Sequence, residues 1–133
     1  IAESKSLGAD AVLLIAAVLG KDLPTYVERA RDYHLETLVE IHNATEAGLA
    51  LGTEASLIGI NNRNLATMTI DRSTTRLLSE QIRPSGRLIV SESGMRSADD
   101  VREMRAYCDA FLIGSSIMAH DQPKKKLEEF VCA

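Results

Sequence analysis

Short apolar runs alternate along this chain with segments whose apolar residues recur at helical spacing, and this alternation restricts the fold more than any other feature. Runs buried on both faces and separated by helices are typical of parallel sheets. The chain has 133 residues and no low-complexity segment, so we expect a single α/β domain over residues 1–133. The predicted strands are Ala11 to Ala17, Glu36 to His42, Leu57 to Asn61, Arg87 to Glu92, and Ala110 to Gly114.

Capping residues mark the helices between these runs. Residues 1–7 are expected to form the end of a helix that Gly8 closes. The helix that opens at Asp71 is predicted to turn Thr74, Leu77 and Leu78 toward the sheet. Other helix starts are predicted at Asp22 with Pro24, Asn43 with Glu46, Ser97 with Asp100, and Asp121 with Pro123.

Composition excludes several classes of protein. The net charge of −4 argues against nucleic acid or an anionic membrane as the main partner. No apolar run is long enough to span a bilayer, and no signal peptide is recognisable, so we expect a cytoplasmic protein. Cys108 and Cys132 lack the spacing of a metal site, and His34 and His120 are expected to be exposed, so no metal is predicted.

Small residues end two of the predicted strands. Leu88-Ile-Val-Ser-Glu-Ser-Gly94 and Ala110-Phe-Leu-Ile-Gly-Ser-Ser116 each change from apolar residues to Gly and Ser. In (β/α) barrels, the loops after the last two strands commonly hold a phosphate through backbone N–H groups, which requires small side chains. Glu92 lies just before the first loop, and a carboxylate there suggests acid/base chemistry on a phosphorylated metabolite.

Strand alternation indicates which side chains share a face. Glu40 is expected to point into the barrel, and Glu92 likewise. Asn61 shares its face with Gly59, whose missing side chain is expected to leave room for a ligand. If these strands are neighbours, Glu40, Asn61 and Glu92 surround one pocket at the rim.

Five motifs in order resemble indole-3-glycerol phosphate synthase, a (β/α)₈-barrel family of tryptophan biosynthesis. They are Gly8-Ala-Asp-Ala-Val-Leu-Leu-Ile15, Leu38-Val-Glu-Ile-His42, Gly59-Ile-Asn-Asn-Arg-Asn-Leu65, Ile89-Val-Ser-Glu-Ser-Gly94 and Phe111-Leu-Ile-Gly-Ser115. The resemblance implies a partial TIM barrel made of the last five of eight βα units. It also implies ring closure of 1-(o-carboxyphenylamino)-1-deoxyribulose 5-phosphate with loss of carbon dioxide and water, without metal or organic cofactor.

The resemblance implies roles for individual residues. Glu40 and Glu92 would be the acid/base pair, in an order that the sequence leaves open, and Asn61 would position a substrate hydroxyl. Substrate and phosphate contacts would come from Leu14 and Leu65 at the anthranilate ring, Arg63 at negative groups, and Ser93, Gly94, Gly114 and Ser115 at the phosphate.

Plainer interpretations stay open beside these. Either glutamate could be a structural carboxylate paired to Arg63 or another base, and Asn61 and Asn62 could be ordinary turn residues. Gly94 and Gly114 could serve only tight turns, and Arg63 could form a surface ion pair.

The resemblance also implies that something is missing from the site. The family's catalytic lysines lie on its first and third strands, in segments that would precede Ile1, so we expect the isolated chain to lack ring-closing activity. The outermost strands would have unpaired edges, which predicts association with a missing N-terminal segment or a second copy. The alternatives are a noncatalytic barrel fragment that self-associates, or another phosphate-binding (β/α) enzyme such as a phosphoribosyl isomerase.

Overall fold

The computed structural model describes residues 1–133 and contains one parallel sheet. Its strands follow one another in chain order, β1-β2-β3-β4-β5, and every neighbouring pair is parallel. The predicted α/β alternation and parallel pairing are therefore confirmed. The strands are β1 (Ala11–Ile15), β2 (Glu36–Ile41), β3 (Leu57–Asn61), β4 (Leu88–Glu92) and β5 (Ala110–Leu112).

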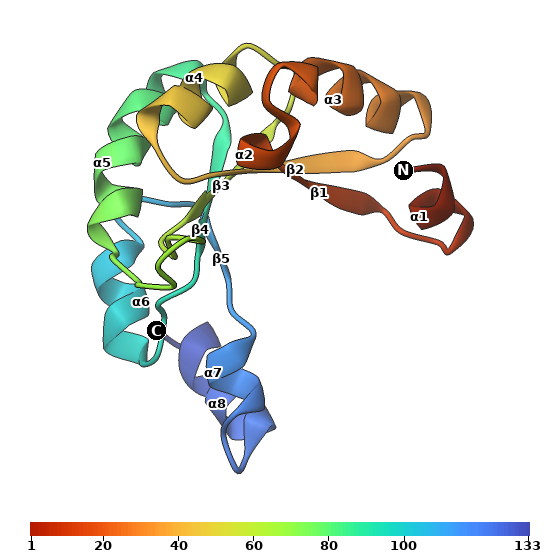
Figure 1. Cartoon of the computed structure of the whole chain (residues 1–133). Helices are drawn as coiled ribbons and strands as arrows, with labels where there is room; N and C mark the ends of the chain where they lie inside the picture. The colour runs from red at the N-terminus through yellow and green to blue at the C-terminus, as the bar shows by residue number, and fades with distance from the viewer.

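Helices connect the strands and lie along one side of the sheet. Figure 1 shows the strands on the inside of an open arc, with α3, α4, α5 and α6 around its outside. The arc does not close, so β1 and β5 each pair with a single neighbour. The helices are α1 (Ala2–Ser6), α2 (Ala16–Leu19), α3 (Leu23–Asp32), α4 (Ala44–Leu51), α5 (Ser73–Ile82), α6 (Ala98–Met104), α7 (Ser115–Met118) and α8 (Pro123–Val131), with short 3₁₀ turns at Gly20–Asp22 and Arg83–Ser85.

Three strands end earlier than the sequence predicted. β1 stops at Ile15 because the fully buried Ala16 already begins α2, and β2 stops at Ile41. β5 stops at Leu112, and Gly114 becomes the N-cap residue of α7. For β1 the strand was predicted too long because a short apolar run has the same pattern in a strand and in the buried first turn of a helix. For β2 and β5 the difference is one or two residues that lie outside the helices that follow.

The starts of α4 and α6 follow the predicted capping chemistry, whereas α5 begins at Ser73 and α8 at Pro123, each two residues after the predicted Asp71 and Asp121 and without a side-chain cap. The Asn43 side chain accepts the Glu46 backbone N–H at 3.0 Å. Ser97 and Asp100 form a complete capping box, in which each side chain accepts a backbone N–H of the other residue. These contacts fix where α4 and α6 leave the rim of the sheet.

One predicted face of α5 is wrong. Leu77 is 68% exposed, whereas Thr75 is fully buried two positions earlier and Leu78 packs against the sheet as predicted. The inward stripe of α5 is Thr75, Leu78 and Ile82, which has helical spacing. Thr75 faces inward because its hydroxyl bonds to buried polar groups at the ends of β3 and β4.

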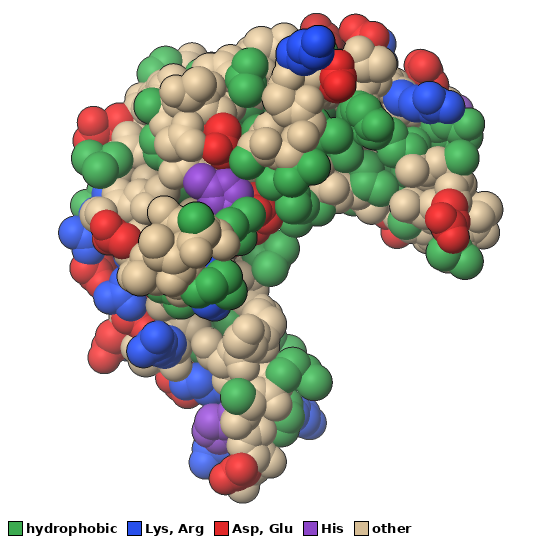
Figure 2. Space-filling model, in the orientation of Figure 1, with side chains coloured by type: hydrophobic (Ala, Val, Ile, Leu, Met, Phe, Trp, Pro, Cys, Tyr) green, Lys and Arg blue, Asp and Glu red, His purple; other side chains and the backbone are tan.

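The two faces of the sheet differ in character. Ile58, Ile60 and Ile89 are fully buried between the sheet and the outer helices. Hydrophobic side chains on the inner face remain open, and they gather on the inside of the arm that carries β1 (Figure 2). Among them, Leu13 is 42% exposed and Leu88 is 52% exposed. The hydrophobic core therefore lies on the convex side of the sheet, while side chains on the concave side remain accessible. No helix is long and apolar enough to cross a membrane.

Candidate active site

A cavity of about 440 Å³ opens at the carboxyl ends of the strands, and we call it the inner cavity. This volume lies within the range of small-molecule sites, about 300–1,000 Å³. Residues of all five strands reach it, because parallel strands end at a common rim. Its wall consists of Leu13, Glu40, Asn61, Arg63, Ile70, Glu92, residues 93–96 and residues 112–116.

Most of the predicted site residues meet in this cavity. The structure brings the three polar residues of the strand ends together with both Gly/Ser loops. The residues of the prediction that line the inner cavity are Glu40, Asn61, Arg63, Glu92, Ser93, Gly94, Gly114 and Ser115. The prediction that these residues lie together at one rim of the sheet is therefore correct, while their roles stay predictions.

The two leucines of the prediction lie elsewhere. Leu14 is 8% exposed and packs in the core between the sheet and the helices, so it is not on the cavity wall. Leu13 takes that place, since it pairs in register with Leu38 on the inner face. The run Ala11–Ile15 has no polar alternation, so the sequence did not reveal which leucine points inward. Leu65 is 49% exposed and borders a neighbouring polar pocket.

Glu40 is buried and held at one oxygen. Its Oε1 accepts a hydrogen bond from Asn61 Nδ2 at 3.2 Å, and His42 Nε2 lies 3.1 Å from the same oxygen without the alignment of a hydrogen bond. Asn61 is itself fixed, because its Oδ1 accepts the Arg63 backbone N–H at 3.0 Å. Glu40 has no ion pair with Arg63, but His42 is a basic residue at ion-pair distance from it, so the interpretation as a structurally paired carboxylate stays open. Asn61 thus holds the Glu40 carboxyl group in a fixed position at the cavity wall.

Glu92, on β4 and separated from Glu40 by β3, has a contrasting environment. Its side chain lies over Gly59, where a Cβ would come within 2.0 Å of Glu92 Oε1. The space above Gly59 therefore holds this carboxyl group, and the prediction that it receives a ligand is wrong. Glu92 is 3% exposed, and its Oε1 has no hydrogen-bond partner. Burial, followed by the charge of Glu40 and a hydrogen bond with it, raises the pKa of Glu92 to about 8.

The loop after β4 has a strained backbone. Ser93 has a φ of 64° and Gly94 a φ of 92°, so two successive residues adopt the left-handed region. For a residue with a side chain this costs about 1–2 kcal/mol. A side chain at Gly94 would also approach Ile70 Cγ2 to 2.9 Å, so both the turn and the packing require glycine there.

Asn62 holds this loop, and sequence reasoning missed its importance. It is 2% exposed, and its Nδ2 donates to the carbonyl oxygens of Glu92 at 3.0 Å and Ser93 at 3.1 Å, and to Ser91 Oγ at 3.1 Å. Its Oδ1 accepts from both the backbone N–H and the hydroxyl of Thr75, at 3.1 and 2.9 Å. The available sequence signal was the Asn-Asn pair at the end of a strand, which is equally typical of a turn.

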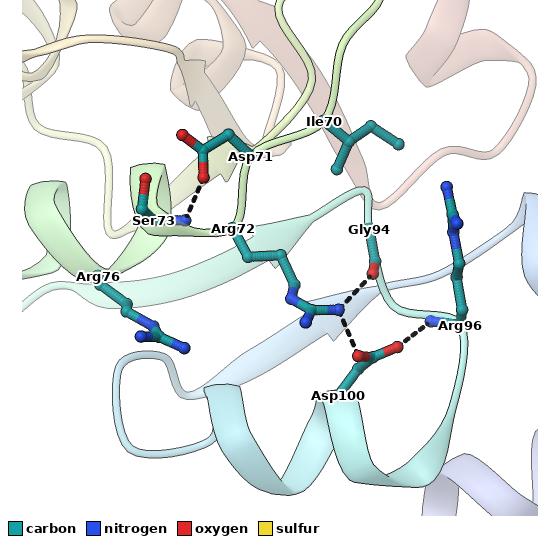
Figure 3. A pocket seen from close by; sticks show the side chains of 8 residues that line it. All are labelled: Ile70, Asp71, Arg72, Ser73, Arg76, Gly94, Arg96 and Asp100. Carbon is teal, nitrogen blue, oxygen red and sulfur yellow. Dashed lines mark hydrogen bonds and ion pairs between the residues drawn. The ribbon is translucent and has the colours of Figure 1, made fainter.

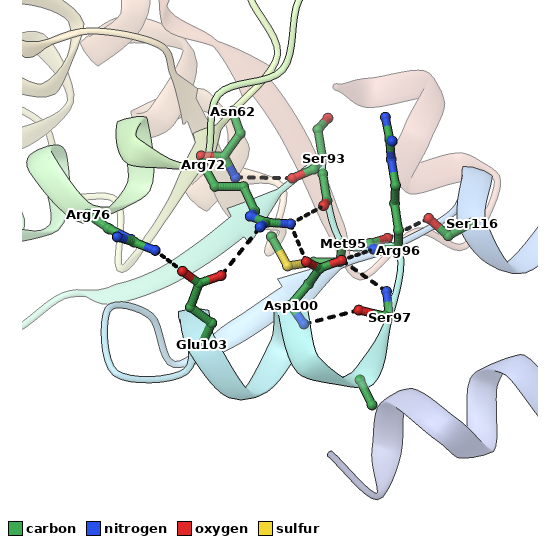
Figure 4. A network of polar contacts seen from close by, with 12 residues as sticks. Asn62, Arg72, Arg76, Ser93, Met95, Arg96, Ser97, Asp100, Glu103 and Ser116 are labelled. Carbon is green, nitrogen blue, oxygen red and sulfur yellow. Dashed lines mark hydrogen bonds and ion pairs between the residues drawn. The ribbon is translucent and has the colours of Figure 1, made fainter.

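Arginines support the same loop from outside. Arg72 donates to the Gly94 carbonyl at 3.4 Å and pairs with Asp100 and Glu103, as Figures 3 and 4 show. Burial alone would raise the pKa of Asp100, but the backbone N–H groups of Arg96 and Ser97 and the charge of Arg72 lower it on balance. A larger hollow of about 600 Å³ lies beside them, and it is lined by Ile70, Asp71, Arg72, Ser73, Arg76, Gly94, Arg96 and Asp100.

This outer hollow is a weaker candidate than the inner cavity. Two of its arginines are already neutralised, Arg72 as above and Arg76 by Glu103. It contains no buried carboxyl group with a raised pKa, whereas Glu92 lies in the inner cavity. No group of three or more His, Cys, Asp or Glu side chains is arranged to hold a metal ion anywhere in the chain. The inner cavity therefore holds a buried proton donor, Glu92, in the same space as a second buried carboxyl group, Glu40.

The topology and the rim together define the class of protein. Parallel strands in chain order, helices on the outer side and paired carboxyl groups at the carboxyl ends of the strands make this chain a part of a (β/α) barrel. The sequence profile described as indole-3-glycerol phosphate synthase matches residues 1–130. The chain belongs to the indole-3-glycerol phosphate synthase family.

Individual relatives agree with this assignment. The chain is 41% identical over 128 residues to the indole-3-glycerol phosphate synthase of Methanocaldococcus jannaschii, covering 96% of this chain and 48% of the relative. It is 45% identical over 134 residues to that of Albidiferax ferrireducens, covering 97% and 49%. The chain thus spans about half the length of these curated relatives.

Solved structures agree on the fold. Tryptophan synthase subunit alpha from Campylobacter jejuni superposes with a TM-score of 0.65 at 18% identity, over 97% of this chain and 56% of that one. At this level of identity the likeness concerns the arrangement of strands and helices alone.

Proposed function

We propose that this chain supplies the acid/base groups and the phosphate-binding loops of an indole-3-glycerol phosphate synthase site. The reaction closes an indole ring from 1-(o-carboxyphenylamino)-1-deoxyribulose 5-phosphate with loss of carbon dioxide and water, a step of tryptophan biosynthesis. The observation that carries the proposal is the carboxyl pair Glu40 and Glu92, which shares one cavity with Asn61 and both Gly/Ser loops.

The environments of the two glutamates assign their roles in this proposal. Glu92, with a pKa of about 8, still holds its proton near neutral pH and acts as the proton donor for the departing hydroxyl. Glu40 acts as the base that removes a substrate proton, because Asn61 Nδ2 holds its carboxyl group in place at the cavity wall. Two carboxyl groups with separated acidities are what a dehydration requires.

The remaining cavity residues bind the substrate in this proposal. Ser93, Gly94, Gly114 and Ser115 hold the phosphate, since small residues let backbone N–H groups approach an anion. Arg63 at the cavity wall neutralises the substrate carboxylate before it leaves. Leu13 packs against the anthranilate ring in place of Leu14, and Leu65 contacts the ring only if the loop that follows β3 moves inward.

Ring closure also needs an acid at the substrate ketone, and no lysine lines the inner cavity. Lys5 donates to the His34 carbonyl and Lys126 pairs with Glu129, both on outer elements. We therefore propose that the chain alone does not close the ring. Further strands, from the rest of the barrel or from a second copy, would pair with the open edges of β1 and β5. Sedimentation velocity showing a compact, stable monomer at micromolar concentration would argue against such association.

The decisive experiment reconstitutes the barrel. The chain is mixed with the part of the Methanocaldococcus jannaschii relative that it does not match, and indole-3-glycerol phosphate is measured. We expect activity from the mixture, none from either part alone, and loss of activity with Glu92→Gln. The control is Glu80→Gln on the exposed side of α5, which should leave activity unchanged. A folded mixture that binds inorganic phosphate at the Gly/Ser loops but forms no product would contradict the enzymatic proposal and favour a noncatalytic role.

A further inference from the structure

His42 lies between two carboxyl groups. Its Nδ1 is 3.0 Å from Glu46 Oε2, and its Nε2 is 3.1 Å from Glu40 Oε1. The three side chains are nearly enclosed, with exposed fractions of 13% for His42, 8% for Glu40 and 13% for Glu46. The His42 ring thus lies between the Glu40 and Glu46 carboxyl groups, with one ring nitrogen close to each. The catalytic roles proposed above do not involve this ring.

Glu46 is held rigidly on the far side of this ring. Its Oε2 also accepts the His42 backbone N–H at 2.8 Å, and its Oε1 accepts Asn43 Nδ2 at 2.6 Å. Because Asn43 caps α4, the ring of His42 is anchored to the first turn of that helix. The imidazole therefore cannot turn away from Glu40 without breaking contacts at the start of α4.

These three side chains also join two separate hollows. Glu40 faces the inner cavity, whereas His42, Asn43 and Glu46 line a polar pocket of about 480 Å³ on the outer side of the rim. Asn61 and Arg63 border both spaces. Glu46 thus acts on the inner cavity only through the ring of His42.

We propose that His42, anchored by Glu46, is a positioning residue that fixes the Glu40 carboxyl group for proton removal. His42 Nε2 and Asn61 Nδ2 both approach Oε1, so Oε2 is left as the oxygen that meets the substrate. The 3.1 Å contact lacks the alignment of a hydrogen bond, and catalytic contacts of this kind commonly tighten when substrate binds. This proposal rests on the proposed function, since Glu40 is assigned as the base there.

The anchor is tested first on the chain alone, without any activity. A ¹⁵N-labelled sample should show a slowly exchanging ring N–H of His42 by NMR. That signal should persist in Asn43→Ser, which keeps a capping oxygen, and disappear in Glu46→Ala. Absence of the signal in the unmodified chain, with folding confirmed by circular dichroism, would overturn the proposal.

The positioning role is then tested in the reconstituted enzyme. His42→Gln and Glu46→Ala should each lower kcat by up to about 100-fold, as small misplacements of a catalytic group do, with KM nearly unchanged. The double variant should be no worse than His42→Gln, because Glu46 acts through the ring. Glu46→Gln, which keeps an acceptor for the ring, should recover most of the activity, and Glu80→Gln on the exposed side of α5 is the matched control.

The outcomes separate the two proposals. Additive losses for His42→Gln and Glu46→Ala, or losses confined to KM, would refute the positioning role while leaving the proposed function intact. A reconstituted barrel without activity but with the His42 ring signal present would refute the proposed function, and the positioning role with it.

Discussion

Replacing Glu92 by glutamine should stabilise this chain near neutral pH, although it removes the proposed acid. The pKa of Glu92 is raised from 4.5 to about 8 by burial and by Glu40. Between these two pH values the folded chain keeps a proton that the unfolded chain has lost. The folded state therefore binds more protons, and its stability falls as pH rises. Below pH 4.5 both states hold the proton, and above about pH 8 neither does.

The size of the effect follows from the shift. One pKa unit corresponds to about 1.4 kcal/mol. Keeping Glu92 buried thus costs the fold roughly 3 kcal/mol at pH 7 and about 5 kcal/mol at pH 8 and above. A domain of this size is stable by only about 5–15 kcal/mol in total, so the difference is easily measured. Glutamine cannot ionise, and its amide can donate to Glu40 as the protonated acid does.

The assay is urea unfolding of the chain and of Glu92→Gln at several pH values from 4 to 9. We expect the two proteins to have equal free energies of unfolding near pH 4, and Glu92→Gln to be more stable by about 3 kcal/mol at pH 7. Glu80→Gln, at an exposed position, serves as the charge-matched control and should follow the unmodified chain. Parallel curves for the unmodified chain and Glu92→Gln across this range would show that an ionised Glu92 is well accommodated, and the reasoning would fail.

Three further substitutions probe the frame around the site. Gly59→Ala should displace the Glu92 carboxyl group from above Gly59 and lower the free energy of unfolding by about 1–3 kcal/mol, measured with urea. The pKa of Glu92 should return toward 4.5, measured by carboxyl ¹³C NMR, and an unchanged pKa would contradict this. Asn62→Ala should cost about 3–5 kcal/mol, because it leaves several buried groups, Thr75 among them, without partners, and a loss under 1 kcal/mol would refute its role as the loop's support. Arg87→Met should lower the free energy of unfolding by about 2–3 kcal/mol, because the Arg87 guanidinium donates to three carbonyl oxygens at the end of α4. Unchanged hydrogen exchange of the α4 amides in this variant would contradict the prediction.

The sequence predicted the rim of this protein better than its details. Polar residues at the ends of otherwise apolar strands identified Glu40, Asn61 and Glu92, because alternation in a strand determines the face of each side chain. The same rule gave no answer for the strand Ala11–Ile15, which is apolar throughout, and this is why Leu14 was predicted in place of Leu13.

The sequence did not predict the contacts between side chains of different strands, for a different reason. That Glu92 covers Gly59 depends on the register of β3 against β4, in which Asn61 pairs with Glu92. The link from Glu46 to Glu40 through His42 depends on the geometry of the loop before α4. Neither register nor loop geometry leaves a periodic pattern in the sequence, so local spacing alone does not predict them.

The distribution of strain argues that the rim is built for chemistry at the expense of stability. The convex side of the sheet is well packed, with fully buried isoleucines and no unpaired charge among them. The unfavourable features gather instead at the ends of β3 and β4, where Glu92 is buried without a partner for Oε1 and Ser93 adopts a left-handed backbone. Such features persist only where the surroundings enforce them, and here Asn62 enforces them from within the wall and Arg72 from outside. A rim that served only to end strands would have no need of this support, whereas one that must keep a carboxylic acid buried and protonated next to a second carboxyl group requires it.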